Sequence, residues 1–172
     1  MTAPPPAPVR VLGIDPGLQV TGYAVLEAGP KAPRVCEAGI IRSAEGKASS
    51  TDMARRLASL YDGIVEVMEE FQPTAVAVEQ LFAHYEHPRT AILMGHARGV
   101  LLLAAGQRRL PVHSYAATRI KKTITGHGRA TKEQVQYTMQ RELGLSRVPE
   151  PADVADALAA ALCHYYLLKM PA

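Results

Sequence analysis

The chain has 172 residues, 48% of them apolar, which is enough for one buried core and excludes a disordered protein. No stretch approaches the roughly 18 uncharged apolar residues of a membrane span, and no secretory signal opens the chain, so we expect a cytoplasmic protein without membrane contact. The net charge of +3 includes a basic segment, residues 84–147, where eleven basic and three acidic residues give +8. This asymmetry suggests a surface that faces a polyanion, and a set of solvated helix faces is the alternative.

Three apolar runs near the start of the chain predict strands joined by short turns. Residues 9–14 are rich in β-branched side chains, and the turn sequence DPG follows directly. Residues 21–26 and 34–41 are typical of two further strands, with GP in their connection. Successive strands with short connections form an antiparallel meander, so we expect these three to lie side by side.

The pattern then changes to alternating helices and strands. Apolar residues at three- and four-residue spacing predict a helix over residues 53–71, and a second long helix is expected over residues 87–109. The runs 75–78 and 111–115 are typical of strands, the first of them buried on both faces. Helices and strands that alternate after a meander predict an α/β fold with a mixed five-stranded sheet and helices on both faces.

The last third of the chain predicts two more helices. A glycine-rich loop at residues 125–129 precedes TKEQ, a capping-box sequence that begins a helix at Thr131. An alanine-rich helix follows over residues 151–168, with proline in its first turn. The domain organisation expected is a flexible tail at 1–8, a single domain at 9–168 and a C-terminal end at 169–172.

Four carboxylates occupy positions where proteins normally avoid charge. Asp15 ends the first strand and Glu79 ends the buried strand, so parallel neighbours would bring both to the sheet edge at which such sheets bind ligands. Asp153 and Asp156 lie three residues apart, hence on one face of the first turn of the last helix. Taken singly, each has another explanation. Asp15 is also explained as a turn residue and Glu79 as a solvated strand end, and the two aspartates of the last helix as acids that favour its N-terminus.

Clustered carboxylates repel one another and raise each other's pKa values unless a cation neutralises them. Oxygen ligands without histidine or cysteine favour Mg²⁺ or Mn²⁺ over zinc. Two such ions about 3.5–4 Å apart hold the attacking water and the leaving oxygen of a phosphodiester in line. The acidic residues therefore suggest phosphodiester hydrolysis with water as the nucleophile.

Five sequence blocks resemble the RuvC family of Holliday junction resolvases. They are LGIDPGLQVTGYAV, VEQLF, GHARGV, the stretch through IKKTITGHGRATKEQV, and ADVADALAAALCH, in family order and spacing over residues 9–166. The resemblance implies an RNase H-like fold and a homodimer that cuts two opposed strands of a four-way DNA junction in recombination and repair. It also implies 5′-phosphate and 3′-hydroxyl ends, and RuvA and RuvB as branch-migration partners.

The resemblance assigns roles to the acidic residues and to one lysine. Asp15, Glu79, Asp153 and Asp156 match the family's four metal-binding positions, which implies two Mg²⁺ ions per site, with Mn²⁺ as a substitute. Lys132 matches a basic catalytic position, where a cation stabilises charge that develops on the phosphate and also contacts DNA.

Four further residues are expected to contact DNA. Phe82 matches an aromatic that touches unstacked bases at the junction centre, and a core phenylalanine is the alternative. Lys121 matches a second functional lysine, and Lys122 is the extra basic residue beside it. Arg129, in the glycine-rich loop, is a candidate phosphate contact or else a solvated loop charge.

Three other classes of protein share part of this pattern. A related RNase H-like nuclease acting on other nucleic acids would share Asp15 but is not expected to have VEQLF followed by GHARGV. An ATPase of the actin or sugar-kinase type needs two such domains, and this length supplies one. A junction-binding protein that does not cut would have no use for four acids that repel phosphate, so a nuclease is favoured.

Overall fold

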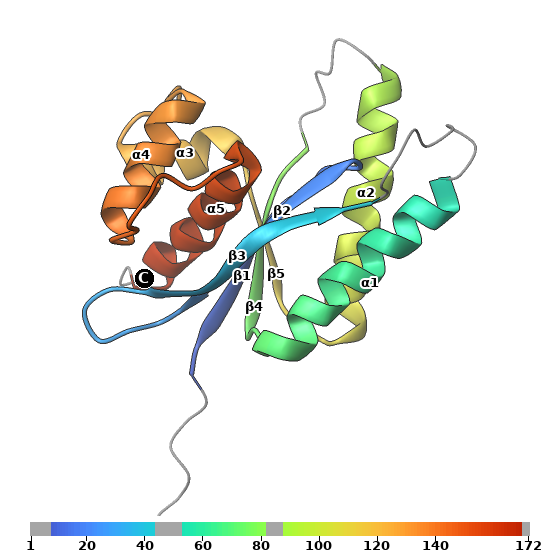
Figure 1. The fold of residues 1–172 in the computed structure, drawn as a ribbon, viewed down its shortest axis with the longest axis horizontal. Helices are drawn as coiled ribbons and strands as arrows, with labels where there is room; N and C mark the ends of the chain where they lie inside the picture. The colour runs from blue at the N-terminus through green and yellow to red at the C-terminus, as the bar shows by residue number, and fades with distance from the viewer. Residues whose placement is uncertain (1–7, 44–52, 82–87, 170–172) are drawn as a thin grey trace, which may run out of the picture.

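The computed structural model describes residues 8–43, 53–81 and 88–169, which form a five-stranded sheet with helices packed against it (Figure 1). The strands are β1 (Arg10–Asp15), β2 (Val20–Glu27), β3 (Arg34–Arg42), β4 (Ala75–Glu79) and β5 (Val112–Tyr115). Their order across the sheet is β3-β2-β1-β4-β5. β1, β2 and β3 pair antiparallel, whereas β4 runs parallel to both β1 and β5. The predicted mixed sheet is confirmed.

Helices cover both faces of this sheet, as predicted. The helices are α1 (Met53–Phe71), α2 (Pro88–Gln107), α3 (Ala117–Thr125), α4 (Lys132–Glu142) and α5 (Ala152–Lys169). α1 and α2 pack on one face, and α3, α4 and α5 lie on the other (Figure 1). None of the helices in the described residues is long and apolar enough to cross a membrane.

α5 packs directly on β1 and β2 because two strand residues lack a side chain. A Cβ atom at Gly13 would lie 2.1 Å from the carbonyl oxygen of Ala157, and one at Gly22 would lie 2.0 Å from that of Asp153. Glycine in a strand interior commonly marks such a close approach of another backbone. The contact at Gly22 holds the first turn of α5 against the sheet.

One helix lies where the sequence pattern predicts none. α3 follows β5 almost directly, Ala116 makes no side-chain cap at its start, and its buried residues are only Ile120 and Ile124. With only two apolar positions among basic side chains, the segment is too short to show the periodicity by which a helix is identified. α4, by contrast, has the predicted capping box, in which Thr131 and Gln134 each accept the other's backbone N–H in their side-chain oxygens.

α2 ends two residues before the predicted position. Its last residue is Gln107, and Arg109 has a left-handed φ of 56°. The N–H of Leu110 bonds back to the carbonyl of Ala105, which closes the turn. Because Pro111 disfavours helical backbone in the residue before it, the chain leaves the helix before the proline.

Candidate active site

Asp15 and Glu79 are the last residues of two neighbouring parallel strands. The register pairs Ile14 with Val78, so the next residue of each strand leaves the sheet at the same edge. Ile14 and Val78 belong to the core beneath α1 and α2, and side chains alternate between the two faces of a strand. Asp15 and Glu79 therefore face α5.

α5 brings two further carboxylates to this edge. Asp153 and Asp156 lie one turn apart, and the backbone of Asp153 rests on Gly22, which pairs with Asp15 in the sheet. Burial, together with the charges of Asp156, Glu79 and Asp153, raises the pKa of Asp15 to about 8. We call these four residues the acidic cluster, since each of the other three acts electrostatically on Asp15.

Within the acidic cluster, the pKa values of Glu79 and Asp156 are raised for the same reasons. Burial is the main cause that raises the pKa of Glu79, and the charge of Asp156 adds to it. Burial likewise raises the pKa of Asp156, with a further contribution from Asp153. Keeping these carboxyl groups ionised therefore costs free energy, and a bound cation would reduce that cost.

Two of the predicted basic residues face the acidic cluster. Lys132, the first residue of α4, lowers the pKa values of Asp15, Glu79 and Asp156 through its positive charge. Lys121, on α3, acts in the same direction on Glu79 and Asp156. The unpredicted helix α3 thus contributes to the site, because it places the Lys121 cation near Glu79 and Asp156.

The remaining predicted residues lie elsewhere. Lys122 is exposed on α3 and Arg129 is exposed in the loop before α4. Within the part of the chain that the structure describes, neither is among the charges that shift the acidic cluster. Phe82 lies outside the described residues.

The donor set of the acidic cluster fits a hard divalent cation, because it consists of carboxylate oxygens and has excess negative charge. Among the residues that the structure describes, however, no three acidic, histidine or cysteine side chains form a ready-made metal site. Charge and donor chemistry, rather than preformed ligand geometry, support a metal here.

Sequence reasoning missed one residue that contacts the site's backbone. Arg98, in the GHARGV block of α2, donates from Nε to the carbonyl oxygen of Glu79 at 3.2 Å. Its Nη2 donates to Oγ of Ser114 on β5 at 2.7 Å. An arginine within a largely apolar helix was the available signal, because a half-buried guanidinium needs polar partners.

A buried polar pair supports α5 behind the acidic cluster. The hydroxyl of Tyr115 and Nδ1 of His164 lie 2.6 Å apart, and the His113 ring stacks on His164 with centroids 4.2 Å apart. Burial, followed by the influence of His113, lowers the pKa of His164 to about 4. His164 is therefore neutral near pH 7, and its Nδ1 is assigned as the acceptor of the tyrosine proton.

Replacing His164 with asparagine, which keeps a hydrogen-bond acceptor, should remove part of the protein's acid sensitivity. In the unfolded chain His164 gains a proton near pH 6.5, whereas the folded chain excludes it down to about pH 4. Stability of the native protein therefore falls as pH drops through this window, by roughly 2 kcal/mol between pH 7.5 and 5. Urea unfolding of both proteins at the two pH values measures it, and an identical pH dependence would contradict the argument.

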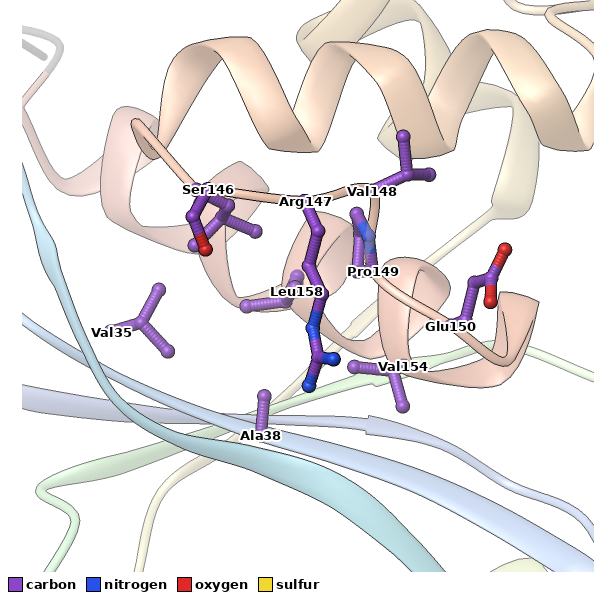
Figure 2. Close-up of a pocket in the computed structure, with 10 residues that line it drawn as sticks. Val35, Ala38, Ser146, Arg147, Val148, Pro149, Glu150, Val154 and Leu158 are labelled. Carbon is purple, nitrogen blue, oxygen red and sulfur yellow. The ribbon is translucent and has the colours of Figure 1, made fainter.

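A cavity of about 420 Å³ lies beside the acidic cluster rather than in it. Figure 2 shows it between β3, the loop before α5, and α5 itself, with Arg147 extending across it toward Ala38. Val154 lines it and follows Asp153 in the chain, yet none of the four carboxylates contributes to its wall. This cavity is therefore separate from the acidic cluster.

The strand order and pairing, with carboxylates at the carboxyl edge of the sheet and on a helix packed against it, define an RNase H-like α/β domain with an acidic site. A family profile described as "Crossover junction endodeoxyribonuclease RuvC" matches residues 11–164. The chain belongs to the RuvC family.

Individual relatives agree with this assignment. The protein of that name from Rhodopirellula baltica is 49% identical over 173 residues, covering 99% of this chain and 94% of that protein. The one from Moorella thermoacetica is 47% identical over 154 residues, covering 90% and 89%. A structure of T. thermophilus RuvC in complex with a Holliday junction substrate is 33% identical with a TM-score of 0.85, and the match covers 94% of this chain and 96% of that one.

Proposed function

We propose that the acidic cluster is the catalytic centre with which this Holliday junction resolvase, a crossover junction endodeoxyribonuclease, hydrolyses phosphodiester bonds. The observation that carries the proposal is the convergence of Asp156, Glu79 and Asp153 on Asp15 at one sheet edge. Metal-dependent nicking of a synthetic four-way junction, lost when any one of these carboxylates is replaced by its amide, tests the assignment.

Members of this family are metal-dependent nucleases, and we assign two Mg²⁺ ions, replaceable by Mn²⁺, to the four carboxylates. Bound divalent ions supply a water of lowered pKa and charge stabilisation for the phosphate. The chain's own contribution is to hold the carboxylates at a rigid edge, with Asp15 and Glu79 on strands and Asp153 and Asp156 on α5. The expected products carry 5′-phosphate and 3′-hydroxyl ends.

The substrate we propose is four-way junction DNA. The T. thermophilus relative is solved with a Holliday junction substrate, and the basic segment of this chain includes α3 and the start of α4, next to the acidic cluster. Lys121, Lys122 and Arg129 are our candidates for phosphate contacts on that side. Phe82, outside the described residues, is proposed as the base-contacting aromatic from the family resemblance alone.

Replacing Lys132 with methionine should slow junction nicking by about 10²–10³-fold, the usual cost of losing one preorganised stabilising group in an active site. Lys132 begins α4 and acts on three members of the acidic cluster, so its cation is well placed to offset charge on the phosphate. The matched control is Arg141→Met in the last turn of the same helix, where the side chain is exposed and pairs with neighbouring Glu142. Single-turnover rates that fall equally in both variants would count against a specific role for Lys132.

We further propose that a second copy of the chain packs on one face of α2, giving the homodimer that paired cutting requires. Ile92 is 60% exposed and Leu103 is 55% exposed. Gly95 and Gly99 lie between them on the same helical face, and no atom of the described residues lies within 4 Å of the position that a Cβ would take. Small residues flanked by large apolar ones allow two helices to approach closely, and a two-fold axis makes such a face self-complementary.

Replacing Leu103 with glutamate should convert the dimer to monomers. The substitution removes apolar burial twice in a symmetric interface and should raise the dissociation constant on the order of 100-fold or more. Tyr137→Glu is the control, because Tyr137 is 64% exposed on α4, away from α2. Sedimentation velocity over a range of concentrations distinguishes the variants, and an unchanged dimer in Leu103→Glu would place the interface elsewhere.

The site of action and the partners rest on the family. Because the proposed substrate is cellular DNA, we propose that the protein acts in the cytoplasm. RuvA and RuvB are proposed as branch-migration partners on family membership alone.

A further inference from the structure

We propose that Arg98 is a positioning residue, which fixes the backbone of Glu79 and so links α2 to the acidic cluster. The inference rests on the proposed catalytic role of Glu79. It assigns a role to a residue of the GHARGV block that carries neither a metal ligand nor a DNA contact in the account above.

The carbonyl oxygen of Glu79, at the end of β4, needs a hydrogen-bond donor that the neighbouring strand does not supply. The N–H of Gln80 donates to the carbonyl of Tyr115 on β5 at 2.9 Å. In a trans peptide the preceding carbonyl points the opposite way, so the carbonyl of Glu79 faces the β1 side. β1 ends there at Asp15, and the next residue, Pro16, has no N–H to donate.

Arg98 supplies the missing donor from α2. Nε donates to the carbonyl of Glu79 at 3.2 Å, and Nη2 donates to Oγ of Ser114 at 2.7 Å. Ser114 pairs with Val78 in the parallel ladder, and Val78 belongs to the core beneath α1 and α2. One guanidinium therefore joins the ends of β4 and β5 from the face opposite the acidic cluster.

This geometry means that Arg98 acts through the backbone rather than through its charge. The Glu79 carboxylate lies on the α5 face, and the charges that lower its pKa are Lys121 and Lys132. Without Arg98 the last peptide of β4 keeps its bond from the N–H of Gln80 to Tyr115 but loses the donor to its carbonyl. We expect the peptide to tilt about the remaining bond and to displace the carboxylate. Loss of Arg98 should thus impair metal binding and the nicking rate, while junction binding without metal is retained.

The position of Arg98 also connects the site to the proposed dimer surface. Arg98 precedes Gly99, and both belong to the helix whose exposed face carries Ile92 and Leu103. Arg98 therefore lies on the helix that we propose as the dimer surface, while its guanidinium reaches the end of β4.

The test compares Arg98→Met, Arg98→Lys and Ser114→Ala with Arg108→Met as a matched control. Arg108 also makes hydrogen bonds, to Glu69 and Ala104 among others, but it follows the last residue of α2, at the end away from the acidic cluster. Four quantities are measured for each protein: Mn²⁺ binding by calorimetry, single-turnover nicking of a four-way junction, junction affinity in EDTA, and the thermal midpoint.

We expect Arg98→Met to slow nicking on the order of 10²-fold, as for a reacting group displaced by about 1 Å, and to weaken Mn²⁺ binding. Ser114→Ala, which removes one neutral hydrogen bond, should slow nicking roughly 2- to 10-fold. Arg98→Lys should lie between the two. Junction affinity in EDTA should stay within about threefold of the native protein, since it does not depend on Glu79 geometry in our account.

Unchanged Mn²⁺ binding and nicking in folded Arg98→Met would overturn the proposal, as would an equal loss in Arg108→Met. If Arg98→Met fails to fold, Ser114→Ala and Arg98→Lys decide the question by the same measurements. If the native protein itself does not nick junctions, the proposed function fails, whereas the effect of Arg98 on Mn²⁺ binding is still read by calorimetry.

Discussion

Asp15→Asn is expected to abolish metal-dependent junction nicking and, in the same protein, to raise the thermal midpoint measured in EDTA. Burial and three neighbouring carboxylates raise the pKa of Asp15 to about 8, from 3.8 in the unfolded chain. Between these values the folded chain binds more protons than the unfolded chain, so its stability falls as pH rises through this window. Asparagine removes the charge and with it this cost.

The size of the effect depends on how far solvent screens the site. Asp15 is only half-buried, so the full difference between the two pKa values is not realised. We expect a gain of about 1–3 kcal/mol at pH 8.5, or roughly 2–10 °C in thermal midpoint, that disappears near pH 4. Asp62→Asn, an exposed aspartate of α1, is the control and should show neither effect.

Bound metal should make the native protein more stable than Asp15→Asn, the reverse of their order in EDTA. Mn²⁺ binds the folded native protein and stabilises it by mass action, and it should stabilise Asp15→Asn much less. Differential scanning fluorimetry from pH 4 to 9, with and without Mn²⁺, measures both effects. Retained nicking, or a variant that is less stable than the native protein at pH 8.5 in EDTA, would contradict this account of Asp15.

Gly22→Ala is expected to remove activity through a single methyl group. The new Cβ would lie 2.0 Å from the carbonyl oxygen of Asp153 and 2.5 Å from its carbon. Both atoms are backbone, so the first turn of α5 must move by more than 1 Å to reach the ~3.5 Å of an ordinary contact. A displacement of about 1 Å at a reacting centre costs on the order of 10²-fold in rate.

Stability should fall together with activity in Gly22→Ala. Inserting a methyl group into a packed contact typically costs about 1–3 kcal/mol. Gly106→Ala makes the same chemical change in the last turn of α2, where no atom among residues 8–43, 53–81 and 88–169 lies within 4 Å of the added carbon. It should be neutral or slightly stabilising. Thermal midpoints and nicking rates of the two variants test the contrast, and a fully active Gly22→Ala would show that α5 is not held by this contact.

The sequence predicts the acidic edge well because each part of it follows from local rules. Asp15 and Glu79 end strands whose apolar runs are easily identified, and neighbouring parallel strands bring their carboxyl ends together. Asp153 and Asp156 share a helical face by spacing alone. The convergence of the four requires only that α5 packs on β1, which Gly13 permits.

Features that depend on contacts distant in sequence could not be predicted in this way. The bond from Arg98 to Glu79 joins α2 to β4, and the pair formed by Tyr115 and His164 joins β5 to α5. No periodicity or spacing encodes such pairs, because they arise from how whole elements pack. The sequence pattern of α3 was too short to identify, so the helical setting of Lys121 was also missed.

The excess positive charge of residues 84–147 is a coarse predictor, because only some of its basic side chains lie near the acidic cluster. The excess of positive charge over residues 84–147 is real, yet it is divided among α2, α3, α4 and their loops. Lys121 and Lys132 act on the acidic cluster, whereas Lys122 and Arg129 stay predicted contacts for DNA. Composition predicts which half of the chain contacts a polyanion, but it does not predict which side chains lie next to the acidic cluster.

The most direct test of the central claim is cleavage of a labelled synthetic four-way junction beside a linear duplex of the same sequence, in Mg²⁺, in Mn²⁺ and in EDTA. Our account predicts paired nicks on two opposed strands of the junction in either metal, none in EDTA, and none on the duplex. Tight binding of the junction without nicking in either metal would contradict it, and would indicate a protein that recognises junctions but does not cut them.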